Sequence, residues 1–125
     1  MSGFLADTNV FLKIFKGNLE LSSFVKKSQS FIDTTIYVEC IQGSKSNHEK
    51  SVIEKYLRCF PLLPITPVTS ALTIELIRKY SNSHGLLLPD ALIAATALEN
   101  DLEIITFDID DFKYIQGLKY MKPSI

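Results

Sequence analysis

The sequence predicts an α/β fold in which parallel strands form one central sheet flanked by helices in three layers. Short apolar runs alternate with longer segments of helical periodicity throughout the 125 residues, and this alternation is the pattern of strand–helix–strand units. The chain contains no internal repeat, low-complexity tract or linker. Its length suits one hydrophobic core. We therefore expect a single domain over residues 1–125.

Apolar spacing assigns the first strand and the two helices after it. Residues 4–7 form a short apolar run that ends at an acid, and apolar residues then recur at helical spacing over 8–16. Gly17 closes this helix. Asn18 is a good cap for the next helical run, over 19–27, because its side chain can accept a hydrogen bond from a free backbone N–H.

The stretch 31–41 is ambiguous, because it is apolar or β-branched almost throughout and propensity alone favours one strand. Such a length is unusual for a strand in a small domain. The prediction is instead a short strand over 30–33, a helix cap at Thr34 or Thr35, and a helix that carries Glu39 on its early turns.

Prolines divide the second half of the chain. An amphipathic helix opens at Asn47, with an apolar stripe that includes Val52 and Phe60, and it ends at Pro61. Pro64 limits the following extended run to an edge strand. The other predicted elements are a helix from Pro67 to Tyr80, a loop over 81–85, a helix from Pro89 to about Glu99, a strand over 102–106, an acidic turn over 107–112 and a last strand over 118–121.

Composition narrows the class of protein. Apolar residues make up 46% of the chain and its net charge is −1, so bulk charge does not point to a polyanion partner, although a local basic patch is compatible with it. No run reaches the roughly 18 apolar residues of a membrane helix, and the N-terminus resembles no signal peptide. Cys40 and Cys59 lie in apolar runs and are expected to be buried thiols in a reducing compartment. The expected location is the cytoplasm.

Four acids occupy positions that suggest a shared site. Asp7 and Asp108 each follow a predicted strand, whereas Glu39 and Asp90 lie on apolar helical stretches. Each strand-end acid has a simpler explanation as a helix cap, and Asp90 as an acid that stabilises a helix N-terminus by about 0.3–1 kcal/mol. Because ligands of open parallel sheets bind at the carboxyl ends of the strands, the four acids together predict one carboxylate cluster at that edge.

Carboxylates gathered at one edge repel each other unless they are protonated or bind a cation. Oxygen ligands without His or Cys favour Mg²⁺ or Mn²⁺, and such ions can activate water for attack on a phosphodiester. Asn9 and Thr106 are candidates to orient a carboxylate or a bound water. His48 and His84 are expected to be surface or loop residues, and the chain has no Ser–His–acid set, P-loop or dinucleotide-binding glycine pattern.

The order of these motifs resembles that of the PIN-domain nucleases, and within them the VapC-type toxins of type II toxin–antitoxin systems. The resemblance spans nearly the whole chain and rests on Leu5-Ala6-Asp7-Thr8-Asn9-Val10, on Glu39, on the helix from Leu88 to Leu98 and on the stretch from Ile105 to Phe112. It departs at Cys40-Ile41 and Gln42-Gly43, where many relatives have Leu or a small residue, and in the hydroxyl-rich stretch 33–35. Neither departure touches the four acids.

This resemblance implies a parallel sheet of strand order 3-2-1-4-5. It implies that the catalytic residues, which also hold Mg²⁺ or Mn²⁺, are Asp7, Glu39, Asp90 and Asp108. The accessory residues would be Asn9 and Thr106, with Asp111 supporting the local turn.

The resemblance also implies what the protein acts on and binds. VapC-type toxins are usually homodimers that cleave structured RNA, often tRNA or ribosomal RNA. A VapB-like antitoxin silences them by placing its C-terminal segment along the cleft. Lys13, Lys16 and Lys45 follow acid-bearing elements and are candidates for RNA phosphate contacts, with solvated surface lysines as the alternative.

Two other functions compete with this interpretation. A response-regulator receiver or a haloacid-dehalogenase-like phosphatase also uses an Asp after a strand, but Asn9 stands where the phosphatase needs its second Asp, and Ile65-Thr66-Pro67 supplies no acid for a receiver. A PIN fold could also act as a binding module without nuclease activity. The complete set of four acids argues against that possibility.

Overall fold

Parallel strands form the central sheet of the computed structural model, which describes residues 2–125. The strands are β1 (Phe4–Ala6), β2 (Ser30–Asp33), β3 (Leu62–Leu63), β4 (Glu103–Ile105) and β5 (Lys119–Met121). Their order is β3-β2-β1-β4-β5, and each neighbouring pair is parallel. The predicted fold class and strand order are therefore confirmed.

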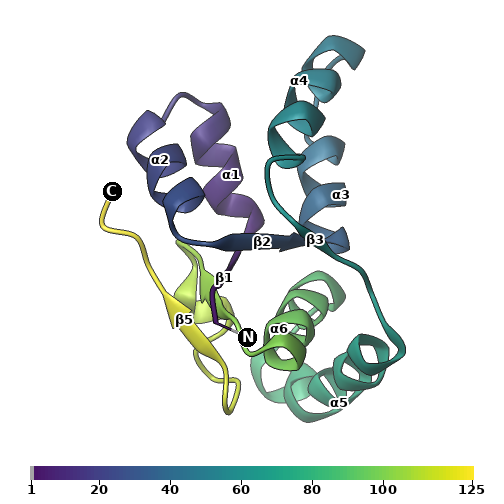
Figure 1. Cartoon of the computed structure of the whole chain (residues 1–125). Helices are drawn as coiled ribbons and strands as arrows, with labels where there is room; N and C mark the ends of the chain where they lie inside the picture. The colour runs from purple at the N-terminus through teal and green to yellow at the C-terminus, as the bar shows by residue number, and fades with distance from the viewer. Residues whose placement is uncertain (1) are drawn as a thin grey trace.

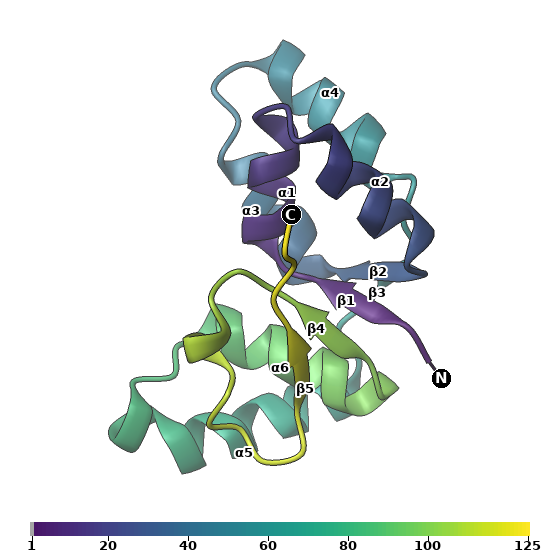
Figure 2. The ribbon, with the colours of Figure 1, turned by 90° about the vertical axis from the view of Figure 1, so that its left-hand side faces the viewer.

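Helices cover both faces of this sheet. They are α1 (Thr8–Phe15), α2 (Leu19–Lys27), α3 (Thr34–Gln42), α4 (Asn47–Leu57), α5 (Pro67–His84) and α6 (Leu88–Asn100), followed by the 3-10 turn η1 (Ile109–Asp111). The first four helices form two hairpins on one side of the sheet, and α5 packs against α6 on the other (Figure 1). Figure 2 shows β1 and β4 side by side, with the start of α1 and η1 near their carboxyl ends.

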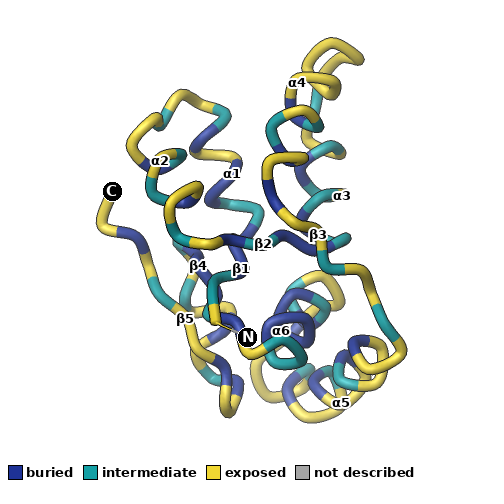
Figure 3. Tube along the Cα trace, viewed as in Figure 1, coloured by how far each residue is buried: buried dark blue, intermediate teal, exposed yellow. Residues whose placement is uncertain are grey.

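The core draws on both layers of helices and on the strands between them (Figure 3). The largest fully buried side chains include Leu5 on β1, Phe11 on α1 and Ile93 on α6. Phe11 meets Phe60 edge to face at 5.3 Å between ring centroids, so it packs inside the domain and is unavailable to a partner. The predicted stripe of α4 was wrong at one position, because Val52 is 55% exposed.

Three predicted boundaries were wrong. The helix predicted from Asn47 to Pro61 ends at Leu57, because a proline disfavours helical geometry in the residue before it. The cap of α3 is Asp33, whose Oδ1 accepts from the Ile36 N–H at 2.9 Å, because a carboxylate one residue before Thr34 reaches that donor. The loop predicted over 81–85 is helical through His84, because no helix breaker occurs before Gly85, which takes the left-handed conformation at φ 70°. Within residues 2–125, no helix is long and apolar enough to cross a membrane.

Candidate active site

Asp7 lies just beyond β1, and hydrogen bonds from two neighbours hold its carboxylate. Oδ1 accepts from the Thr8 N–H at 2.8 Å, and Oδ2 accepts from the Thr106 hydroxyl at 2.9 Å. The side chain is 6% exposed. Burial raises the pKa of Asp7 to about 7, against the opposing effect of these hydrogen bonds, and the carboxylates of Asp90 and Glu39 raise it further. Asp7 is therefore the N-cap of α1, as the simpler explanation of this acid predicted. It is also a buried acid that lies close to other carboxylates.

Thr106, which follows the neighbouring strand β4, links Asp7 to Asp108 by hydrogen bonds. Its fully buried hydroxyl accepts from the Asp108 N–H at 3.0 Å and from Asn9 Nδ2 at 3.2 Å while it donates to Asp7. Asn9 Nδ2 also donates to Asp108 Oδ2 at 3.1 Å. The structure therefore brings Asn9, Thr106, Asp7 and Asp108 together, and Asp108 makes no side-chain cap bond to η1.

Glu39 and Asp90 approach this group from two different helices. Glu39 lies in the second turn of α3, and its Oε1 accepts from the Thr8 hydroxyl at 2.6 Å. Asp90 lies in the first turn of α6. Burial raises the pKa of Asp90 to about 6, followed in effect by repulsion from Asp111, Glu39 and Asp108. The four predicted acids thus lie within electrostatic reach of one another, as the strand-end argument expected.

Asp111 contributes to this cluster mainly through its charge. Its backbone N–H donates to the Asp108 carbonyl at 3.1 Å, a bond that does not involve the carboxylate. Burial, then Asp108 and Asp110, raise the pKa of its exposed carboxyl. Asp111 therefore adds a further negative charge beside Asp90.

The three candidate lysines differ in their distance from these acids. Lys13 Nζ lies 4.5 Å from the ring centroid of Phe107, and the Phe107 N–H donates to Asn9 Oδ1 at 3.2 Å. Lys13 is therefore beside the cluster. Lys16 is exposed at the C-cap of α1. Lys45 lies on the connection between α3 and α4, beyond the end of α3 that is farther from the sheet (Figure 1).

Comparison with known proteins identifies the family. The PIN domain family matches residues 4–118. The chain belongs to the PIN-domain family. It is 27% identical to ribonuclease VapC1 of Rickettsia felis, over 98% of this chain and 97% of the relative. It is 29% identical to ribonuclease VapC10 of Mycobacterium tuberculosis, over 92% and 90% of the two chains. The receiver and phosphatase alternatives are therefore dropped.

Solved structures agree with this assignment. A chain of a toxin–antitoxin complex from Klebsiella pneumoniae has 30% identity and a TM-score of 0.77, over 91% of this PIN domain and 93% of that chain. DNA-bound VapBC from Salmonella typhimurium has a TM-score of 0.81 and 22% identity, over 98% of both chains, and supports the fold.

The donor atoms of this PIN domain fit a hard divalent cation. Among residues 2–125, no three Asp, Glu, His or Cys side chains already form a group that could hold a metal ion. The cluster nevertheless carries uncompensated negative charge, since the salt bridges found in the described chain join Lys113 to Asp110 and Lys119 to Asp101 instead. Several carboxylates without a basic partner are the ligands that Mg²⁺ and Mn²⁺ prefer.

Sequence reasoning missed several residues around the site. Asp33 is the last residue of β2 and Asp7 directly follows β1, so the sequence carried a similar signal for both acids. Asp33 is 1% exposed, and burial raises its pKa. Its Oδ2 has no hydrogen-bond partner. Thr8 was named only as part of a motif, yet its hydroxyl donates a hydrogen bond to Glu39. Tyr114 had no sequence signal; burial, Asp90 and Asp111 raise the pKa of its phenol.

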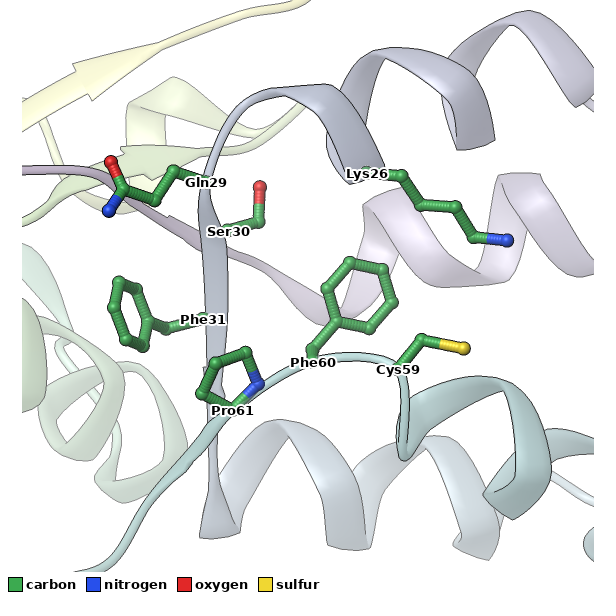
Figure 4. A pocket seen from close by; sticks show the side chains of 7 residues that line it. All are labelled: Lys26, Gln29, Ser30, Phe31, Cys59, Phe60 and Pro61. Carbon is green, nitrogen blue, oxygen red and sulfur yellow. The ribbon is translucent and has the colours of Figure 1, made fainter.

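The two cysteines have different environments, and the prediction for Cys59 was wrong. Cys40 is buried, and burial followed by Glu39 and Asp7 raises the pKa of its thiol to about 12. Cys59 is exposed, because the turn after α4 gives the buried position to Phe60. Its side chain lines a hollow of about 470 Å³ with Lys26 and Phe31 (Figure 4). This hollow lies at the amino end of β2, away from the acid-bearing edge.

Proposed function

We propose that this PIN domain is a metal-dependent endoribonuclease and the toxin of a toxin–antitoxin pair. The observation that carries the proposal is the meeting of Asp7, Glu39, Asp90 and Asp108 at one edge of the sheet, from four separate parts of the chain. The ribonuclease names of its relatives support the same reaction. The substrate class expected from the family resemblance is structured RNA, such as tRNA or ribosomal RNA.

The four acids would hold Mg²⁺ or Mn²⁺, and such an ion supplies an activated water and neutralises phosphate charge when bound. The chain's own polar residues keep the acids in place. Thr106 orients Asp7, Thr8 orients Glu39, and Asn9 orients Asp108. Each tied carboxylate keeps lone pairs for another ligand, since a carboxylate has about four acceptor sites.

The raised pKa values of Asp7 and Asp90 affect how cation binding depends on pH. With values of about 7 and about 6, these carboxyls are partly protonated near neutral pH in the absence of a cation. Metal binding requires the deprotonated form and releases protons. Cation affinity should therefore rise with pH between about 5 and 8. Lys13, whose Nζ lies beside the Phe107 ring, is our candidate to contact a phosphate of the bound RNA.

The direct test is cleavage of total RNA by the purified chain with Mn²⁺ or with EDTA. Asp90→Asn and Asp108→Asn should each lower the rate at least about tenfold, because each removes a negative charge from the cluster. Asp110→Asn is the matched control, since Asp110 lies in the same turn but is exposed and paired with Lys113 at 2.8 Å. Full activity in Asp90→Asn would contradict the proposal.

The alternative, a binding module without nuclease activity, predicts a different result. Such a domain would cleave no RNA under any condition. Its melting temperature would also hardly change with Mn²⁺, because stabilisation by a ligand requires binding to the folded state. The nuclease proposal predicts a rise in melting temperature for wild type that is smaller in Asp90→Asn.

Two protein partners form part of the proposal. The first is a VapB-like antitoxin, supported by relatives solved as toxin–antitoxin complexes. An apolar hollow of about 530 Å³ between the first helical hairpin and α4 offers a surface for it, with Leu19 81% and Val52 55% exposed. The substitution Leu19→Asp should abolish co-purification of an inhibitor of cleavage and leave cleavage intact.

The second partner is another copy of the chain, since related toxins are usually homodimers. Leu87 and Leu88, at the start of α6, are 70% and 59% exposed, and Val38 on α3 is 39% exposed. A hollow of about 280 Å³ is lined by Val38 and Glu39 on α3 and by Leu88 on α6. Light scattering should report a dimer for wild type and a monomer for Leu88→Lys.

A further inference from the structure

Three aromatic side chains form a cluster at the end of α5 that the proposed catalysis does not use. The rings of His84 and Tyr114 are stacked, with 4.2 Å between centroids and 5° between planes. Tyr80 meets these two rings edge to face at 5.9 Å and 5.2 Å. The buried Tyr80 hydroxyl also accepts from the Gln116 N–H at 3.1 Å. Tyr80 thus fastens the segment that carries Tyr114 to α5.

The stacked pair is accessible and held in orientation. His84 is exposed and Tyr114 is half-buried. The Ser83 hydroxyl lies 2.8 Å from His84 Nδ1 and is hydrogen-bonded to it. An exposed imidazole in a fixed plane contributes little to a core that already contains Tyr80, so the pair needs a reason other than burial.

The pair borders the acid cluster. Tyr114 is three residues after Asp111, which limits the separation of their Cα atoms to about 11 Å. His84 precedes Asp90 by the short connection between α5 and α6. Both carboxylates contribute to the raised pKa of the Tyr114 phenol. Figure 2 shows the end of α5 and the segment after η1 on the side toward which β1 and β4 point.

A cation accompanies the aromatic cluster. Lys79 Nζ lies 5.5 Å from the Tyr80 ring centroid and 3.4 Å from Gln116 Oε1, and the salt bridges of the described chain do not include it. Aromatic planes beside a positive charge are the combination that binds single-stranded nucleic acid, because bases stack on the rings and the cation contacts phosphate.

We propose that the His84–Tyr114 stack, with Lys79 over the neighbouring Tyr80 ring, binds an unpaired base of the RNA strand whose backbone crosses the acid cluster. This inference rests on the proposed function, because it names the form of RNA that the site accepts. The site would require an unpaired nucleotide next to the cleaved bond, and it would select loops and single-stranded segments within a structured RNA.

Binding can be tested separately from cleavage. The probe is a short single-stranded oligoadenylate carrying one 2-aminopurine, in EDTA and in an Asp7→Asn background, with its fluorescence quenching and affinity measured together. Removing both rings, in His84→Ala/Tyr114→Leu, should weaken binding by between about 5-fold and about 150-fold and relieve the quenching. The matched control, His84→Phe/Tyr114→Phe, keeps both rings and should bind like the parent.

Two further variants sharpen the test. Lys79→Gln should lower affinity and reduce the slope of log affinity against log salt by about 0.7, as expected for one lost phosphate contact on a single strand. If the double variant does not fold, His84→Ala alone serves, because His84 is exposed at the end of a helix. The 2-aminopurine probe should be quenched less by His84→Ala than by His84→Phe.

The outcomes separate this inference from the proposed function. Equal affinity and equal quenching in the ring-free and ring-keeping proteins would overturn the inference and leave those rings to a protein partner, whatever the cleavage assay shows. Absence of RNA cleavage by the wild-type chain would count against the proposed function. Ring-dependent binding of the oligoadenylate would still support base binding by the His84–Tyr114 stack.

Discussion

Asp7→Asn should stabilise the metal-free protein at pH 8 and much less at pH 5. Burial raises the pKa of Asp7 from 3.8 to about 7. A carboxyl with a higher pKa in the folded state favours folding only while it is protonated, so stability falls as pH rises from about 4 to about 7. Since one pKa unit corresponds to about 1.4 kcal/mol, ionised Asp7 destabilises the fold by about 4 kcal/mol at pH 8 and by about 1.5–2 kcal/mol at pH 5.

The amide also changes one hydrogen bond. Asn at this position can still accept from the Thr8 N–H, but its NH₂ group cannot accept from the Thr106 hydroxyl. That loss costs about 1 kcal/mol at either pH. The net stabilisation by Asp7→Asn should therefore be about 3 kcal/mol at pH 8 and less than about 1 kcal/mol at pH 5.

Urea unfolding in EDTA at the two pH values measures this difference directly, provided the slope against urea is the same for both proteins. Asp110→Asn is the control, because Lys113 lowers the pKa of exposed Asp110. Replacing this carboxylate should therefore not raise the free energy of unfolding at pH 8. The reasoning would be refuted if the stability difference between Asp7→Asn and wild type were the same at pH 5 and pH 8. Asp7 would then have no raised pKa in the folded protein.

Three further predictions concern neighbouring side chains. Thr106→Val should lower the free energy of unfolding by about 1–3 kcal/mol, because it leaves the groups bonded to that hydroxyl without a partner, and urea unfolding would show it. Thr8→Val should slow RNA cleavage about 10-fold by freeing Glu39, with Thr8→Ser as the rescuing control and a stability change of no more than about 1 kcal/mol. A thiol reagent should label Cys59 in the folded protein and leave Cys40 unmodified until denaturant is added, as mass spectrometry would report; rapid labelling of Cys40 would contradict its burial and raised pKa.

Local spacing in the sequence determined the order of the elements and many, but not all, of their ends. A glycine, an asparagine or a proline marks most helix boundaries, and these residues act through their own backbone and side chain, so neighbours in sequence suffice to place them. The same reasoning placed Asp7 and Asp108 at strand ends. Parallel pairing then put those ends at one edge, which is why the acid cluster could be predicted.

Only the tertiary structure decided which side chains meet at that edge. Thr106 reaches Asp7 across 99 positions of sequence, and Thr8 reaches Glu39 across 31, because the sheet order places β4 and β2 on either side of β1. The same packing brings Tyr114 onto His84 and leaves Cys59 at the surface. Such contacts depend on how helices and strands pack in three dimensions, and the spacing of residues along the chain does not predict that packing.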